Sequence, residues 1–171
     1  MDFVIKTAIG NLKITCEDSH IIRIEITDEN ENKNLNKMQN EIKNKFVDYF
    51  NGKGLLDDLP IKINATPFRE KVYVELLKVS YGQTVTYKDL ALRINNPNAA
   101  RAVGSAMKNN PLPFVIPCHR VVGTNNPGAY AYGADLKYFL LDMEKANAHK
   151  FNLWFFLNFY YNMTWRFIWK F

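Results

Sequence analysis

The chain has 171 residues, 47% of them hydrophobic, which is enough to bury a core in one large domain or two small ones without disulfides. Its two cysteines, Cys16 and Cys118, are far apart and fit no zinc-ligand spacing, which argues against a disulfide framework or a zinc module. The net charge of +5 is uneven: residues 1–60 carry 8 basic and 11 acidic side chains, residues 61–146 carry 11 and 6, and residues 147–171 carry 3 and none.

The basic middle of the chain favours a polyanionic partner such as nucleic acid. An excess this small is more often an ordinary solvated surface, so charge alone does not decide. The opening "MDFVIKTAIGNLKIT" alternates apolar and polar residues and turns like a hairpin, unlike a secretory leader. We therefore expect an intracellular protein, located in the cytoplasm, a reducing compartment.

Residues 2–27 alternate apolar and polar side chains, which predicts three short antiparallel strands. The charged stretch that follows predicts an amphipathic helix closed by Gly52, because its apolar residues recur at steps of three and four: Leu35, Met38, Ile42, Phe46 and Phe50. A short strand, "LPIKI", comes next. Residues 1–63 thus form a small α+β unit, in which we expect no chemistry from Cys16 or His20.

The next segment, residues 64–147, is predicted to be mainly helical. Thr66 and Pro67 are a helix N-cap and a first-turn proline, and "TPFREKVYVELLKV" has its apolar residues at helical spacing. After a turn at Tyr81-Gly82, a second helix begins near Thr86, and a third, "AARAVGSAMK", follows "NPN". Two short helices joined by a tight turn indicate a helix-turn-helix, although such pairs also occur as plain scaffold.

Small residues leave the surface of the third helix nearly bare. Arg101 projects from among Ala99, Ala100, Ala102 and Gly104. Close packing against another helix is one explanation. The other is a helix pressed into a nucleic-acid groove, with one long cation reaching beyond the contact surface.

The stretch "FVIPCHRVV", residues 114–122, places a cysteine, a histidine and an arginine in an apolar run. Buried His and Arg side chains cost several kcal/mol unless they are paired. Cys118 as a nucleophile needs a base, and His119 is adjacent, although neighbouring side chains of an extended segment point to opposite faces. A water or a local bend would then couple the two. Glu144, in the final helix "ADLKYFLLDMEKAN", is a candidate to orient the imidazole. The alternative is a buried structural cysteine.

An aromatic-rich tail of unknown role, residues 148–171, ends the chain. Its Asn, Thr and Arg residues argue against a membrane span. Four aromatic residues alternate as they would on a strand face: Trp165, Phe167, Trp169 and Phe171. The tail is an added element packed on the core, a patch for self-association or for a membrane surface, or an unselected extension; the first and last are favoured.

Four stretches together carry a resemblance to a known family. They are "TPFREKVYVELLKVSYGQTVTYKDLA", "NAARAVGSAMKNNPLP", "IPCHRVVG" and "GAYAYGADLKYFLLDMEKAN", and they run nearly unbroken over residues 66–146. In order and spacing they resemble the O6-alkylguanine-DNA alkyltransferase family, suicide proteins that remove alkyl lesions from DNA. The resemblance implies an α+β protein in which residues 1–63 correspond to a variable N-terminal domain and residues 64–147 bind DNA and transfer the alkyl group.

The resemblance also implies roles for individual residues. Cys118 would accept the alkyl group, His119 would be the base acting through a bound water, and Glu144 would hold the imidazole. Tyr87 would donate to the flipped guanine, and Arg101 would fill the vacated base stack. The other binding residues belong to the minor-groove helix, the hinge and the guanine pocket: Ala99, Ala100, Ala102, Gly104, Met107, Asn110, Val121, Tyr130 and Ala131.

The expected activity is irreversible, single-turnover transfer from O6-alkylguanine in double-stranded DNA after base flipping. O4-alkylthymine is left open as a further substrate. We expect a monomer that needs no cofactor and has no membrane span. We also expect no metal, because the zinc-binding residues of some relatives are absent from the N-terminal region.

Two residues depart from the family pattern. Ala131 stands where many relatives have serine, but it keeps the backbone N–H that would donate to O6. Tyr132 stands where glycine is common, and could narrow the pocket against bulky alkyl groups. Cys118 itself argues against the related non-catalytic lesion-binding proteins, which replace the cysteine. Two alternatives from other classes are a module that recognises damaged DNA and recruits other repair factors, and a cysteine hydrolase, for which no oxyanion hole is evident.

Overall fold

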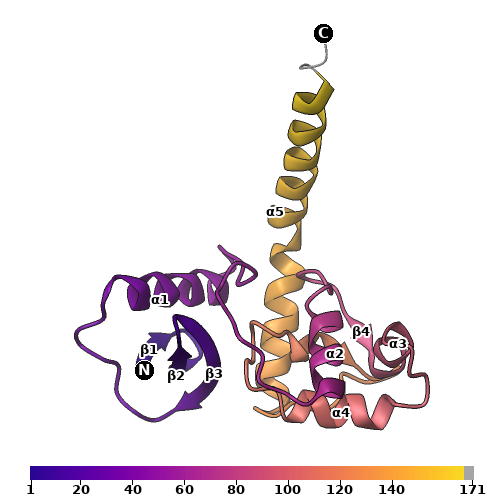
Figure 1. Ribbon diagram of the computed structural model, residues 1–171, viewed down its shortest axis with the longest axis horizontal. Helices are drawn as coiled ribbons and strands as arrows, with labels where there is room; N and C mark the ends of the chain where they lie inside the picture. The colour runs from indigo at the N-terminus through magenta and orange to yellow at the C-terminus, as the bar shows by residue number, and fades with distance from the viewer. Residues whose placement is uncertain (168–171) are drawn as a thin grey trace.

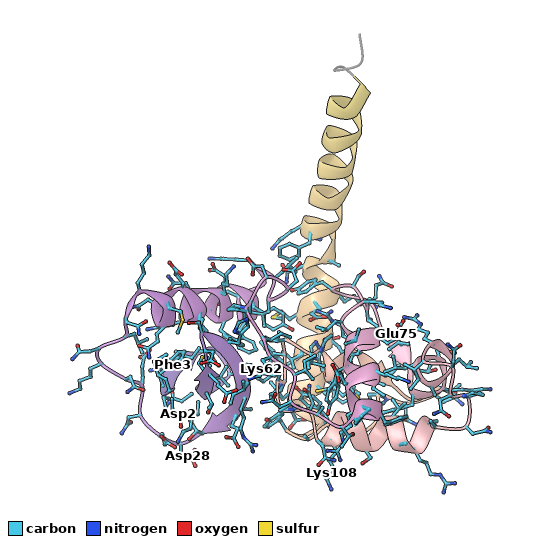
Figure 2. All side chains as sticks on the ribbon, viewed as in Figure 1. Asp2, Phe3, Asp28, Lys62, Glu75 and Lys108 are labelled. Atoms are coloured by element: carbon cyan, nitrogen blue, oxygen red, sulfur yellow. The ribbon has the colours of Figure 1, made fainter. Side chains whose placement is uncertain are left out.

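The structure is a computed structural model that describes the backbone of residues 1–167 and the side chains of residues 1–151. A sheet with one helix forms the N-terminal unit, and a helical body follows it (Figure 1). Side chains fill the space between the ribbons of the two units (Figure 2). The predicted α+β class is confirmed.

Three antiparallel strands form the sheet of the N-terminal unit, in the order β1-β2-β3, and confirm the prediction for residues 2–27. The strands are β1 (Asp2–Thr7), β2 (Gly10–Glu17) and β3 (His20–Thr27). Because successive side chains of a strand point to opposite faces, alternate apolar residues share one buried face. Ile14 lies at its centre, paired with Phe3 on one side and Ile24 on the other.

The helix α1 (Lys37–Phe50) packs against this sheet. Asn36 caps it: the Asn36 side chain accepts from the Gln39 N–H, and the Gln39 side chain accepts from the Asn36 N–H, both at 2.9 Å. Its buried face carries Ile42, Phe46, Tyr49 and Phe50. The predicted strand over "LPIKI" is reduced to one bridge between Ile21 and Ile61.

The helical body contains the predicted helix pair. Its elements are α2 (Pro67–Leu76), β4 (Val85–Thr86), α3 (Tyr87–Arg93), α4 (Ala100–Lys108), the 3-10 turn η1 (Cys118–Arg120), β5 (Val121–Val122) and α5 (Ala134–Phe167). The Thr86 side chain caps α3 by accepting from the Asp89 N–H at 3.0 Å. The short strand β4 pairs in parallel with β5, which ties the start of α3 to the chain just after Cys118.

The segment between α4 and η1 joins the cores of the two units. Phe114 is 1% exposed and has a φ of +72°, a left-handed conformation that is uncommon for a bulky residue. Its ring meets Phe50 of α1 edge to face at 5.2 Å and stacks on Tyr132 at 6.2 Å. One continuous hydrophobic cluster therefore includes residues of both units.

The tail continues α5 as a helix through Phe167 and extends away from the rest of the molecule (Figure 1). The strand-like alternation at Trp165 and Phe167 was therefore misleading, because adding a residue to an existing helix is easier than starting a new element. Trp169 and Phe171 lie outside the described residues, as do the side chains beyond Phe151, so the alternatives for the tail stay untested. Over the described residues, no helix combines the length and the apolar character that crossing a bilayer requires.

Candidate active site

Cys118 begins the 3-10 turn η1 and is 4% exposed. An extended segment was expected here, but the turn places the side chains of Cys118 and His119 about a third of a rotation apart rather than on opposite faces. The turn is a local bend, but it makes no direct hydrogen bond between the Cys118 sulfur and the His119 ring among the described residues, so coupling through a water stays a prediction. Pro117 lies directly before the turn and has no backbone N–H, so it leaves no donor there that needs a hydrogen-bond partner.

Asn110 holds the thiol from the hinge after α4. Its amide nitrogen donates to the Cys118 sulfur at 3.2 Å and to the Ile116 carbonyl at 2.8 Å, while its oxygen accepts from the Leu112 N–H at 3.0 Å. Burial raises the pKa of Cys118, and the Asn110 hydrogen bond and the charge of Lys137 act in the opposite direction. The thiol is therefore protonated at rest and needs a base to become a nucleophile.

His119 is fully buried beside Glu144. Its Nε2 lies 2.9 Å from Oε1 of the carboxylate, and its Nδ1 has no partner among the described residues. Because a carboxylate only accepts, Nε2 carries the proton and Nδ1 keeps a free lone pair. Burial lowers the pKa of His119, against the opposing effect of Glu144, so the imidazole is neutral and able to accept a proton.

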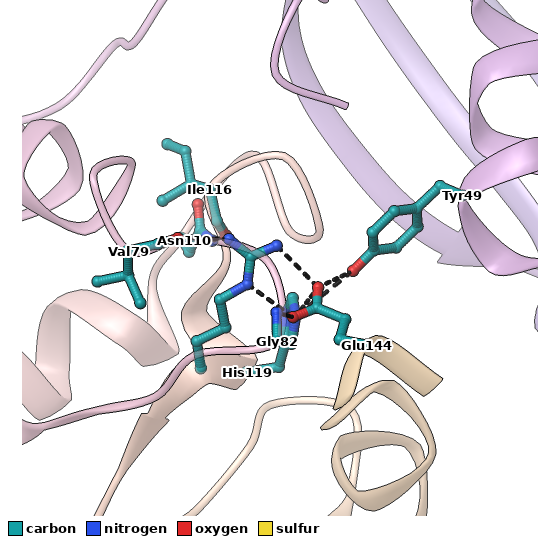
Figure 3. Close-up of polar contacts among 8 residues, drawn as sticks. Tyr49, Val79, Gly82, Asn110, Ile116, His119 and Glu144 are labelled. Atoms are coloured by element: carbon teal, nitrogen blue, oxygen red, sulfur yellow. Dashed lines mark hydrogen bonds and ion pairs between the residues drawn. The ribbon is translucent and has the colours of Figure 1, made fainter. Parts of the chain in front are cut away.

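The Glu144 carboxylate accepts five hydrogen bonds (Figure 3). Arg120 supplies two at 2.8 Å, from Nε to Oε2 and from Nη2 to Oε1. His119 and the Tyr49 hydroxyl bond Oε1, and the Gly82 N–H bonds Oε2 at 3.2 Å. Burial alone would raise the pKa of Glu144, but the hydrogen bonds and charges of His119 and Arg120 hold it far below its usual range.

Gly82 packs directly on α5 in the turn after α2. Its φ is +75°, and a Cβ added there would lie 2.6 Å from the Ala148 Cβ. This close approach brings the Gly82 N–H within reach of Glu144. The predicted turn at Tyr81-Gly82 therefore supplies a donor to the site.

A cavity of about 700 Å³ lies beside this network. Its walls come from α3, α4 and the loop before α5: Tyr87, Ala100, Arg101, Gly104, Met107, Lys108, Ala129, Tyr130 and Ala131. The Tyr87 hydroxyl donates to the Ala129 carbonyl at 3.3 Å across one end. Burial raises the pKa of Tyr87 and of Tyr130. The Tyr130 ring meets the His119 ring edge to face at 6.5 Å, so the cavity wall contacts the buried network.

All of the predicted site residues except Ala99, Ala102 and Val121 fall into two groups. Cys118, His119, Glu144 and Asn110 form the buried network, and seven others line the cavity: Tyr87, Ala100, Arg101, Gly104, Met107, Tyr130 and Ala131. Ala99 is half-buried at the start of α4, and Ala102 is exposed on its outer face, as Arg101 is. Lys108 lies at the outer edge of the helical body (Figure 2). Val121, another of the predicted binding residues, has a carbonyl that already accepts from Lys137 at 2.7 Å.

Tyr132 lies behind the wall of this cavity rather than among the residues that line it. Its ring stacks on Phe114 and meets Tyr130 at 5.7 Å, so it supports the cavity wall. Its effect on bulky alkyl groups stays a prediction.

Three residues of the site were missed from the sequence: Tyr49, Arg120 and Lys137. Arg120 was noticed only as a buried cation in need of a partner, and that partner is Glu144. Lys137 is 1% exposed and bonds the Val121 and Ala129 carbonyls, so it joins the strand after Cys118 to the cavity wall. Its place on the buried face of α5, three residues before Leu140 and seven before Glu144, was an available signal.

We expect Lys137→Met to change how stability depends on pH. Burial lowers the pKa of Lys137 from 10.5 to about 8. Between these values the unfolded chain still binds the proton that the folded chain has lost, so the contribution of Lys137 to stability rises with pH. From urea unfolding, the stability of the wild type relative to Lys137→Met should increase by about 2 kcal/mol between pH 7 and pH 9.5. If the stability difference between the wild type and Lys137→Met were the same at both pH values, the buried environment assigned to Lys137 would be wrong.

Two family models match this chain, one over each of the two units seen in the fold. Residues 3–63 match the family model of the 6-O-methylguanine DNA methyltransferase ribonuclease-like domain, and residues 67–146 match that of its DNA binding domain. A probable methylated-DNA–protein-cysteine methyltransferase of Acanthamoeba polyphaga mimivirus is 39% identical over 84% of this chain and 96% of its own length. The chain belongs to the 6-O-methylguanine DNA methyltransferase family. A constitutive Bacillus subtilis member is 34% identical over 82% of this chain and 92% of its own length.

Solved structures of the 6-O-methylguanine DNA methyltransferase family share the fold. The Mycobacterium tuberculosis O6-methylguanine methyltransferase is 27% identical, with a TM-score of 0.72 over 86% of this chain and 94% of that one. M. tuberculosis OGT in complex with DNA is 28% identical, with a TM-score of 0.76 over 85% and 93%. Among the side chains that the structure describes, no three His, Cys, Asp or Glu residues gather closely enough to hold a metal ion.

Proposed function

We propose that the protein repairs double-stranded DNA by moving the alkyl group of O6-alkylguanine to the Cys118 sulfur, once per molecule. The observation that carries this proposal is a buried thiol, hydrogen-bonded by Asn110, next to a neutral His119 whose Nδ1 has no partner in the part of the chain that the structure describes. Membership of the family supports it, as does the similarity to M. tuberculosis OGT in complex with DNA.

The target base leaves the duplex before it reacts. A thiol that is 4% exposed cannot reach a base inside the stack, and flipping costs a few kcal/mol, less for a lesion that pairs poorly. The cavity, whose Tyr130 wall contacts His119, has the size of a small-molecule site and is lined largely by apolar and tyrosine side chains. The exposed Ala102 allows close approach of α4 to the minor groove, while Arg101 reaches into the vacated stack.

Transfer is an in-line displacement at an sp3 carbon. The thiol proton passes through a bridging water to Nδ1 of His119, a new S–C bond forms, and the C–O6 bond breaks with its electron pair left on guanine. The Tyr87 O–H leaves the Ala129 carbonyl and donates to N3, while the Ala131 N–H donates to O6; both bonds stabilise that charge until solvent supplies a proton. The Val121 carbonyl uses one lone pair for Lys137 and keeps the second for the guanine amino group. The thioether product is stable, so each molecule acts once.

The same proposal assigns the parts of the chain. Residues 1–63 form the N-terminal domain, residues 64–147 the DNA-binding and alkyl-transfer domain, and residues 148–171 a tail outside the chemistry. The protein acts as a monomer in the cytoplasm. Both cysteines are free, which fits a reducing compartment.

Intact-protein mass spectrometry tests the transfer. The protein is mixed with excess duplex carrying one O6-methylguanine, and the modified peptide is then mapped. One added methylene mass per protein, confined to the Cys118 peptide, is expected. An unchanged mass with lesion-selective gel shifts would overturn transfer in favour of a recognition module. An unchanged mass without binding would overturn both.

A further inference from the structure

Tyr49 connects the N-terminal unit to the buried network. It lies near the end of α1, is 1% exposed, and donates its hydroxyl proton to Oε1 of Glu144 at 2.7 Å (Figure 3). The same hydroxyl lies 3.4 Å from Nε2 of His119. Its ring is held edge to face against Phe50 at 5.1 Å and Tyr81 at 6.1 Å. The hydroxyl therefore has one well-defined place, between the carboxylate and the imidazole.

Oε1 of Glu144 has more hydrogen-bond donors around it than it has lone-pair positions. It receives the Tyr49 O–H, the His119 Nε2–H at 2.9 Å and an Arg120 N–H at 2.8 Å. A carboxylate oxygen offers about two lone-pair positions, so three donors share them and each bond is weaker than it would be alone. The Tyr49 bond thus reduces the pull of Glu144 on the imidazole.

The strength of that pull sets the basicity of His119. A carboxylate that interacts more strongly with Nε2–H stabilises the charged imidazolium and raises the pKa of the ring. An imidazolium has no lone pair at Nδ1 and cannot accept the thiol proton. The ionisable groups that face the His119–Glu144 pair come from every element packed around it: Tyr49 of α1, Tyr81 of the turn after α2, Cys118 and Arg120 of η1, Tyr130 of the cavity loop, and Lys137 of α5.

We propose that Tyr49 is a positioning residue for alkyl transfer, which holds Oε1 of Glu144 and limits its pull on His119 so that the imidazole stays neutral and Nδ1 remains available to Cys118. This rests on the proposed function. Through Tyr49, the N-terminal unit contributes a side chain to the active site. The high pKa of Tyr49, raised by burial and then by the charge of Glu144, keeps the hydroxyl protonated as a donor.

Tyr49→Phe removes the hydroxyl and retains the ring. We expect the acid limb of the single-turnover methyl transfer rate to move upward by about 0.5–1 pH unit, because His119 then becomes protonated at a higher pH. The ¹⁵N chemical shifts of His119, titrated without DNA, should show the same displacement. Fluorotyrosine at position 49 is a stronger donor of the same shape, and should move both curves to lower pH.

Ile42→Val is the matched control, since it removes one buried methylene from the same helix and retains the hydroxyl. It should leave both curves where the wild type has them. The proposal is overturned if Tyr49→Phe and the wild type coincide in both curves, or if Ile42→Val shifts them equally, which would indicate packing alone. If the wild type transfers no methyl group, the proposed function fails, and the His119 titration still decides the role of Tyr49.

Discussion

Cys118→Ala should abolish methyl transfer, while binding to a duplex with one O6-methylguanine stays within about threefold of the wild type, a difference below 1 kcal/mol. The sulfur belongs to the buried network, next in sequence to His119, whose ring contacts the Tyr130 wall of the cavity. Removing it leaves the walls of the cavity intact. Intact mass spectrometry measures transfer, and gel shifts with lesion-free competitor measure binding.

Cys16→Ala is the matched control. Cys16 is as buried as Cys118, at 4% exposed, and burial raises the pKa of its thiol too. It lies in β2, far from the histidine of the network in sequence and fold, so this variant should gain one methyl group as the wild type does. A methylated Cys118→Ala protein would place the acceptor elsewhere and contradict the proposed mechanism.

Local sequence patterns predicted the sheet and the helix of the N-terminal unit, but they did not predict the geometry of the site. The alternation in residues 2–27 and the helical steps from Leu35 to Phe50 each extend over several periods, and both elements formed. The turn at Cys118 spans three residues, too few for any period to appear, and the apolar run around it favours a strand. The geometry that relates the thiol to the imidazole was therefore not available from the sequence.

Long-range pairing explains the missed residues. Tyr49 and Glu144 are 95 positions apart, and Tyr49 belongs to the apolar face of α1, where an aromatic residue is ordinarily core. Only the docking of the two units shows that its hydroxyl reaches a carboxylate. Glu144 was a candidate from its place in the final helix, but the five donors around it come from three other segments of the chain, which no local pattern reveals.

Glu144→Gln should lower the methyl transfer rate by about 10²–10⁴-fold and the free energy of unfolding by about 3–5 kcal/mol. The amide has one acceptor oxygen where the carboxylate has two, and its nitrogen brings further donors into a place already filled by donors. In this variant, Arg120 loses the negative charge of the carboxylate, which offsets the free-energy cost of burying its guanidinium group. His119 loses the acceptor that keeps its proton on Nε2. Single-turnover kinetics and guanidinium unfolding measure the two effects.

The pH dependence separates this loss from a general packing defect. Because the pKa of Glu144 is depressed in the folded protein, its stabilisation is present above its ordinary value of 4.5 and is lost as pH falls below it. The stability gap between wild type and Glu144→Gln should therefore narrow in acid. Glu75→Gln is the control, since it removes only the carboxylate of a surface pair with Lys78 and should cost less than about 1 kcal/mol. Transfer by Glu144→Gln within tenfold of the wild type would show that the imidazole needs no carboxylate to act.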